Sequence, residues 1–149
     1  MTGPSTANKI ISRCLQYFIA SILLATGIGK ALDIPGFTEV LITYQALADW
    51  MLYPVAIGAT FVEIILSIWL FSGRLLSLGA LSSLGLHAVF TIWTAVAYMR
   101  GQDIPNCGCF GVFFARPLDG WTIVEDFVMV GFSAALFVLA RRNESESFK

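Results

Sequence analysis

Four long apolar segments constrain this 149-residue chain more than any other feature of its sequence. They run roughly over residues 10–28, 55–71, 75–98 and 123–140. Each predicts a membrane-spanning helix, because a helix needs about 20 mostly apolar residues to cross a bilayer. The composition agrees, since 57% of the residues are hydrophobic and only 13% are charged, against about 25% charged in an average soluble domain. We therefore predict an all-α, four-transmembrane-helix bundle that forms a single domain over residues 1–149.

Composition and charge exclude several other classes of protein. The net charge is −1, so no basic surface is predicted for nucleic acid, and three cysteines are too few for a disulfide scaffold. The first apolar segment is longer than the core of a typical secretory signal, and no small-x-small cleavage site follows it before Lys30. We therefore expect it to be retained as a helix. The second segment should open at Tyr53-Pro54, because proline is tolerated in a first helical turn.

The distribution of Lys and Arg predicts the orientation of the chain in a membrane. With four spans, both termini and the turn near Arg74 lie on one side, and the two longer loops lie on the other. The first side carries Lys9, Arg13, Arg74, Arg141, Arg142 and Lys149, whereas the second carries Lys30, Arg100 and Arg116. By the positive-inside rule, we expect a multi-pass protein of a bacterial inner membrane with cytoplasmic termini and both long loops outside.

The first long loop, residues 32–52, carries a helical pattern of its own. Apolar side chains recur there at helical spacing, namely Phe37, Val40, Leu41, Tyr44 and Leu47. We predict a short amphipathic helix that lies at the membrane interface. Before the fourth span, Thr122 and Glu125 match a capping box, which predicts a helix start at this point.

The second long loop contains the pair Cys107 and Cys109, separated by Gly108. Cysteines two apart can reach disulfide distance only in a bent loop, and glycine gives the backbone that freedom. A closure this small should be strained, and a strained, exposed disulfide exchanges readily with other thiols. It would also remove little chain entropy, which weakens the case for a structural disulfide. Redox exchange is favoured, while a structural disulfide and a soft-metal site, for example for Cu(I), stay open as alternatives.

Two titratable residues lie near the predicted middle of the membrane. Counting about 1.5 Å per residue along their segments places Glu63 and His87 close to the bilayer midplane. A charged carboxylate there costs about 2.5–3.5 kcal/mol on insertion scales, so Glu63 should face the bundle interior, with His87 as the expected partner. The two would form either a polar clasp between helices, which is favoured, or a proton relay or contact to a quinone-like ligand.

Three further residues lie at the two ends of the first span. Lys30 and Asp33 would form an ion-paired cluster beneath the cysteine loop, or Lys30 would extend to the membrane interface, which is the favoured alternative. Cys14, at the opposite end, is expected to be a small buried thiol that is too distant to pair with the loop.

The chain resembles the MauE family of methylamine-utilisation proteins, within the wider DoxX-like group of four-helix membrane proteins. The resemblance extends over nearly the whole chain. Its matching positions are Gly27-x-x-Lys30, Asp33, Phe37, Tyr44, Glu63 and the segment Cys107-Gly108-Cys109-Phe110-Gly111. The cysteine segment is the most specific part of this pattern.

The resemblance implies a function as well as a fold. Members of the family are expected to help mature a disulfide-rich periplasmic client, such as methylamine dehydrogenase, beside a periplasmic thioredoxin-like protein. The wider group includes subunits of quinone-linked membrane oxidoreductases, so a quinone is the one cofactor implied here, and no metal is expected.

We therefore predict an integral membrane thiol–disulfide component in which Cys107 and Cys109 exchange with a thioredoxin-like partner. The alternative is a non-catalytic assembly or accessory subunit of an oxidoreductase complex, in which a disulfide only shapes a docking loop. The two predictions separate on the reduction potential of the pair, because structural disulfides lie below about −300 mV. Whether the protein is itself an enzyme stays open.

Overall fold

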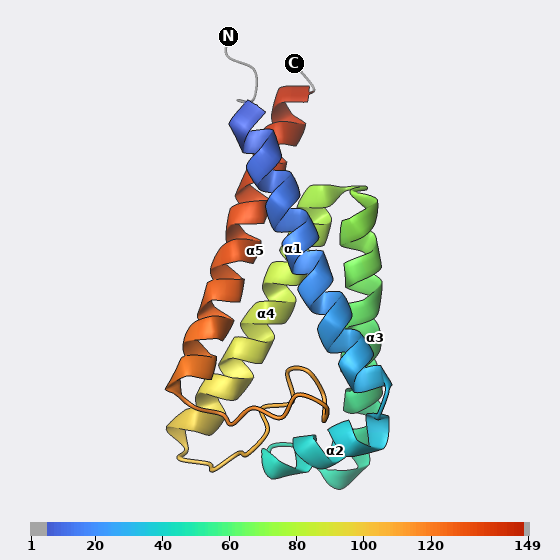
Figure 1. Cartoon of the computed structure of the whole chain (residues 1–149), viewed down its shortest axis with the longest axis vertical. Coiled ribbons are helices and arrows are strands. Elements are labelled where there is room, and N and C mark those ends of the chain that lie inside the picture. The colour runs from blue at the N-terminus through green and yellow to red at the C-terminus, as the bar shows by residue number, and fades with distance from the viewer. Residues whose placement is uncertain (1–5, 148–149) are drawn as a thin grey trace.

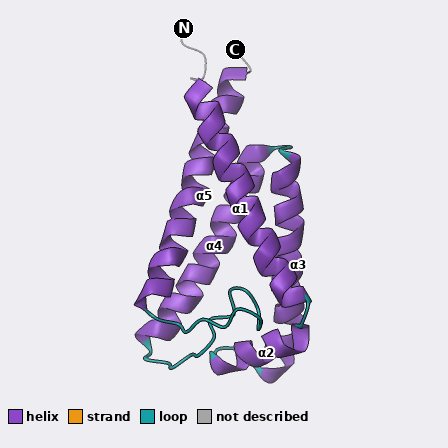
Figure 2. Cartoon of the chain, viewed as in Figure 1, coloured by secondary structure: helices purple, strands orange, loops and turns teal. Residues whose placement is uncertain are grey.

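The computed structural model describes residues 6–147, and all regular structure in this range is helical (Figure 2). The elements are α1 (Thr6–Ala31), α2 (Ile34–Thr43), α3 (Asp49–Ser72), α4 (Leu76–Met99) and α5 (Gly120–Ser147). Helices α1, α3, α4 and α5 are long and apolar enough to cross a membrane. The predicted all-α fold with four spans and one short helix in the first long loop is confirmed.

The four long helices form two pairs, in which α1 packs mainly against α3 and α4 against α5. The described ends of the chain and the α3–α4 turn lie toward one end of the bundle, here called the terminal end (Figure 1). At the opposite end, the loop end, α2 lies across the bundle beside the segment 100–119, here called the cysteine loop. The arrangement agrees with the grouping of loops that was predicted from four spans.

Many large apolar side chains lie on the outside of the bundle, whereas several small polar ones are buried inside, beside an apolar cluster that includes Ile19, Leu70 and Leu136. On α3 the outer face exposes Phe61, Ile65 and Ile68, whereas the inner face buries Thr60, Glu63 and Ser67. The inner polar groups join helices, since the Ser67 hydroxyl donates to the carbonyl of Ala20 over 2.8 Å. Such a distribution suits a lipid environment, where apolar surface needs no burial and helices associate through small and polar residues.

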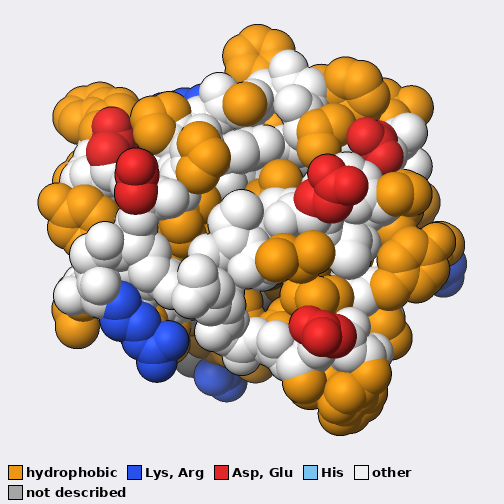
Figure 3. Space-filling model, turned by 90° about the horizontal axis from the view of Figure 1, so that it is seen from below, with side chains coloured by type: hydrophobic (Ala, Val, Ile, Leu, Met, Phe, Trp, Pro, Cys, Tyr) orange, Lys and Arg blue, Asp and Glu red, His pale blue; other side chains and the backbone are white. Residues whose placement is uncertain are grey.

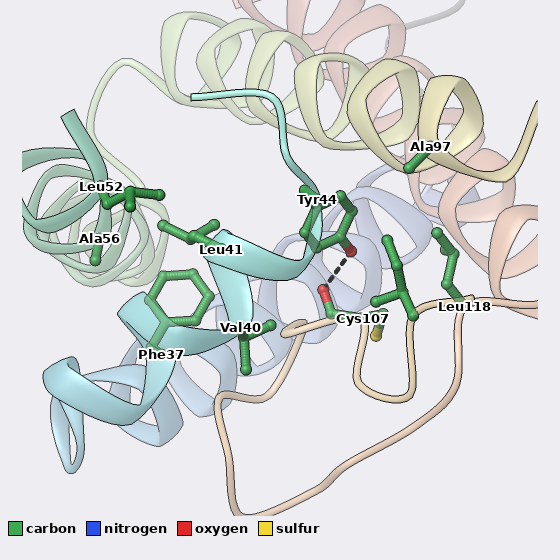
Figure 4. Close-up of a cluster of buried hydrophobic side chains, with 10 residues drawn as sticks. Phe37, Val40, Leu41, Tyr44, Leu52, Ala56, Ala97, Cys107 and Leu118 are labelled. Carbon is green, nitrogen blue, oxygen red and sulfur yellow. Dashed lines mark hydrogen bonds between the residues drawn. The ribbon is translucent and has the colours of Figure 1, made fainter. Parts of the chain in front are cut away.

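A cluster of buried apolar side chains fixes α2 at the loop end (Figure 4). It joins Phe37, Val40, Leu41 and Tyr44 with Leu52 and Ala56 of α3, Ala97 of α4, and Ile104, Cys107 and Leu118 of the cysteine loop. The apolar face that the sequence indicates in residues 32–52 is therefore used to hold the cysteine loop.

Helices α3 and α5 begin earlier than the sequence analysis predicted, and this changes how each one starts. Helix α3 begins at Asp49, so Pro54 lies inside it and removes one hydrogen bond from an early turn. Helix α5 begins at Gly120 and is capped by Asp119, whose Oδ1 accepts from the N–H of Thr122 over 2.9 Å. The predicted capping box is wrong, because Thr122 lies within the helix and a better capping carboxylate precedes it.

Candidate functional site: the cysteine loop and the cavity beneath it

The cysteine loop bends at Gly108 and Gly111, where φ is +77° and +70°. Glycine adopts these left-handed conformations without the strain that other residues would suffer. The bend brings Cys107 and Cys109 together, and their Sγ atoms lie 2.8 Å apart as free thiols. The proximity expected from the spacing is thus present, and the redox role of the pair stays a prediction.

Hydrogen bonds to its backbone hold the first cysteine in place. The hydroxyl of Tyr44, just after α2, donates to the carbonyl of Cys107 over 2.7 Å (Figure 4). The N–H of Cys107 donates to the carbonyl of Arg116 over 2.7 Å, and the N–H of Gly108 donates to Asn106 Oδ1 over 2.9 Å. Burial raises the pKa of Tyr44, so its hydroxyl stays protonated and able to donate.

Close packing against α1 and α2 clamps the bend on both sides. A Cβ added to Gly111 would lie 2.5 Å from the carbonyl oxygen of Gly29 in α1, and one on Gly29 would lie 2.5 Å from the carbonyl oxygen of Phe110. A Cβ on Gly108 would lie 2.9 Å from Val40 Cγ1 of α2. Three residues of the cysteine segment therefore lie against helices that are distant in the sequence.

The two thiols differ in acidity and in access. Hydrogen bonding from the Cys109 thiol lowers the pKa of Cys107 to about 7. The same hydrogen bond, together with burial, raises the pKa of Cys109. Near neutral pH the pair therefore carries at most one negative charge, centred on Cys107. As whole residues, Cys107 is buried and Cys109 is half-buried.

Glu63 faces the bundle interior as predicted, but its partner is Lys30 rather than His87. Lys30 Nζ lies 2.5 Å from Glu63 Oε1, and the two residues are 3% and 1% exposed. The expectation that Lys30 extends to the interface is wrong, because α2 and the cysteine loop cover the end of α1. The ammonium lies 5.4 Å from the ring centroid of Phe37 and 5.2 Å from that of Phe90.

His87 belongs to a different polar cluster, which joins α4 to α5. Its Nδ1 lies 3.0 Å from the hydroxyl oxygen of Ser133 and 3.3 Å from that of Ser83. Within residues 6–147, its Nε2 makes no hydrogen bond. The polar clasp between helices is therefore made by His87 and Ser133, and Glu63 takes no part in it.

The other two residues at the ends of α1 also differ from expectation. Asp33 caps α2, since its Oδ1 accepts from the N–H of Gly36 over 2.9 Å, and the ion-paired cluster with Lys30 is not formed. Cys14 is exposed rather than buried. The reason lies in helix geometry, because Ser12 faces the interior and a displacement of two residues turns a side chain by about 200°.

A cavity of about 730 Å³ lies beneath the cysteine loop and connects the two parts of the site. Its lining includes Cys107, Cys109, Lys30, Glu63 and His87. Residues predicted separately, from the cysteine motif and from their depth in the membrane, therefore meet around one space. The structure leaves their proposed roles in catalysis and cofactor binding as predictions.

Among the charged residues that line this cavity, the sequence analysis missed three as site residues, Arg116, Glu125 and Asp126. Asp126 Oδ2 accepts a hydrogen bond from the hydroxyl of Thr94 over 2.7 Å. Arg116 forms an ion pair with Glu125, in which Nη1 and Oε2 lie 2.7 Å apart. In the sequence, Glu125 and Asp126 look like ordinary carboxylates in the first turn of a helix. Only the earlier start of α5 places Asp126 in the second turn, inside the span.

Comparison with known proteins agrees with this architecture. The family model of methylamine utilisation protein MauE matches residues 8–140, a range that includes the cavity and the cysteine loop. The chain is also similar to the methylamine utilization protein MauE of Paracoccus denitrificans, with 24% identity over 122 residues. That alignment covers 82% of this chain and 66% of the relative, slightly less than two thirds of its length. No solved structure matches.

Proposed function

The chain belongs to the MauE family of methylamine utilisation proteins, and we propose that its task within that family is thiol–disulfide exchange at Cys107 and Cys109. The observation that carries this proposal is the glycine-bent loop, which holds two free thiols 2.8 Å apart. The exchange would serve the maturation of a disulfide-rich periplasmic enzyme such as methylamine dehydrogenase, with a thioredoxin-like protein as the direct partner.

The difference between the two thiols supports a specific order of steps. When the pair is oxidised, a thiolate of the partner attacks Sγ of Cys109. The bond between the two loop sulfurs breaks, and Cys107 leaves as a thiolate, which its lowered pKa favours. A second partner thiolate then attacks the partner's sulfur in the mixed disulfide and releases Cys109, which takes up a proton. The partner gains a disulfide, and the pair is left reduced.

The proposal includes an orientation in which the loop end faces the periplasm and the terminal end faces the cytoplasm. It is supported by the excess of Lys and Arg at the terminal end and by the oxidising chemistry of the periplasm, where disulfides persist. Figure 3 looks onto the loop end, where separated acidic side chains lie among hydrophobic ones. This mixed surface is where a thioredoxin-like partner would approach Cys109.

A redox titration of the purified protein in detergent tests the proposal. Alkylation followed by mass measurement reports the fraction of the pair that is oxidised at each potential. Exchange requires a midpoint well above about −300 mV, the level below which structural disulfides lie. A midpoint below that level, together with normal function of the Cys107→Ser/Cys109→Ser variant, would reject exchange in favour of an accessory subunit.

A further inference from the structure

The cavity beneath the cysteine loop has apolar walls that come from all four spanning helices. Phe18 lies on α1, Ala59 on α3, Phe90 on α4 and Phe132 on α5. The rings of Phe18 and Phe132 meet edge to face with centroids 5.6 Å apart. The volume of about 730 Å³ falls within the range of about 300–1,000 Å³ that small-molecule sites occupy.

The cavity communicates with the outer surface of the bundle. Val124 and Val128 of α5 line it and are also 50% and 46% exposed. The two helices α1 and α5 diverge toward the loop end (Figure 1). Because lipid surrounds the sides of spanning helices, an apolar molecule can enter here from the bilayer.

Three polar groups that line this space have hydrogen-bonding capacity that the described residues leave unused. Glu63 Oε2 is buried without any hydrogen-bond partner within the described range 6–147. Lys30 Nζ carries three N–H bonds and makes one hydrogen bond there, to Glu63. His87 Nε2 is also free in that range. An unpaired buried polar atom costs about 1–3 kcal/mol, so this set favours a ligand that both accepts and donates hydrogen bonds.

We propose that the cavity binds a membrane quinone, with Lys30, Glu63 and His87 holding its polar ring beside the cysteine pair. The inference rests on the proposed exchange function, because it names the oxidant that regenerates the disulfide. Ring carbonyls accept hydrogen bonds from Lys30 and His87, and the hydroxyl of the reduced ring can donate to Glu63 Oε2. The apolar walls and the lateral opening match a ring that carries a lipid tail.

The redox step balances on these residues. Cys107 and Cys109 lose two electrons and two protons, and the bond between their sulfurs forms. The quinone gains the two electrons and two protons at its oxygens and leaves as the quinol. An acyl chain alone would fill the same apolar walls, but it offers neither an acceptor for Lys30 nor a donor for Glu63.

Tryptophan fluorescence measures this binding without reference to activity, because quinones quench the emission of indole rings. Two of the four tryptophans, Trp93 and Trp121, line the cavity. The wild-type protein in lipid nanodiscs is titrated with decylubiquinone. We expect saturable quenching that stearic acid does not reverse. Quenching that fails to saturate, or that stearic acid reverses, would overturn the inference.

Variants locate the binding determinants. Lys30→Met alone leaves Glu63 buried without a partner and can fail to fold, so the test uses Lys30→Met/Glu63→Leu, which removes both charges. We expect binding about tenfold weaker, since hydrogen bonds to charged groups are the stronger ones. Lys9→Met, on the same helix near the terminal end, is the matched control and should bind as the wild type does. Equal binding by the double variant would overturn the inference.

The Cys107→Ser/Cys109→Ser variant separates this inference from the proposed exchange. It should bind decylubiquinone within about twofold of the wild type, yet form no quinol, whereas the reduced wild type forms one quinol per pair. If quinone fails to bind while the wild type still forms mixed disulfides, the quinone inference alone is wrong. If quinone binds as expected but no mixed disulfide forms, the exchange function alone is wrong.

Discussion

Replacement of Gly111 by alanine tests whether the cysteine loop is clamped against α1. Gly111 has a φ of +70°, and an added Cβ would lie 2.5 Å from the carbonyl oxygen of Gly29 and 2.8 Å from its carbonyl carbon. Both are backbone atoms of a helix, so they cannot rotate away as a side chain can. The loop would have to lift from α1 and would carry Cys109 with it.

Two other glycines separate the contributions to the expected cost. Gly101 has a φ of +67° but no atom within 4 Å of an added Cβ, so Gly101→Ala should cost only left-handed strain, about 1–2 kcal/mol. Gly58 is helical and also uncrowded, so Gly58→Ala should stabilise the protein, by about 0.5–1 kcal/mol. Gly111→Ala adds overpacking to strain and should cost about 2–5 kcal/mol.

Thermal unfolding in detergent checks the order of these variants, with alkylation of Cys109 as a second readout. The midpoint should be highest for Gly58→Ala, slightly below wild type for Gly101→Ala, and lowest for Gly111→Ala. The displaced loop should also make Cys109 react faster with a bulky maleimide. If Gly111→Ala unfolds at the same temperature as Gly101→Ala, the loop is not clamped and the account of the site's geometry is wrong.

Three further predictions concern the thiols and the buried ion pair. Alkylation of the reduced pair should accelerate as pH rises through about 7, where Cys107 loses its proton. Cys109→Ala should move this midpoint to higher pH, and an unchanged midpoint would show that the hydrogen bond from Cys109 does not lower the pKa of Cys107. Lys30→Met should cost about 3–5 kcal/mol of stability in denaturant titration, because it leaves Glu63 buried without its partner. Lys30→Met/Glu63→Leu should recover most of this loss, and an equal loss in the single and the double variant would show that the two residues form no pair. An impermeant maleimide applied to intact cells with a reductant should modify the cysteine loop and spare Cys14, and labelling of Cys14 alone would reverse the orientation.

The spans and the cysteine bend were predictable because each depends on local physics. An apolar run of about 20 residues has few alternatives to a spanning helix, and two cysteines around a glycine can meet only in a bend. The inner face of α3 could also be predicted, since a carboxylate such as Glu63 is too costly to expose to lipid.

The partners of the buried groups could not be predicted in the same way. Position along a segment gives depth in the membrane but leaves the facing helix unknown, so His87 was the expected partner of Glu63 and Lys30 was expected at the interface. Lys30 pairs instead because α1 continues to Ala31 and because α2 covers its end. That cover depends on contacts between distant segments, which neither periodicity nor spacing reveals.

Trapping of mixed disulfides tests thiol–disulfide exchange most directly. The Cys107→Ser and Cys109→Ser variants are produced in their own host membrane, quenched in acid, and analysed by mass spectrometry. Because attack at Cys109 releases Cys107, the better leaving thiolate, Cys107→Ser should accumulate a covalent adduct between Cys109 and a thioredoxin-like protein, and Cys109→Ser should accumulate much less. The absence of any adduct in both variants, with normal client maturation in the double variant, would contradict the proposed function.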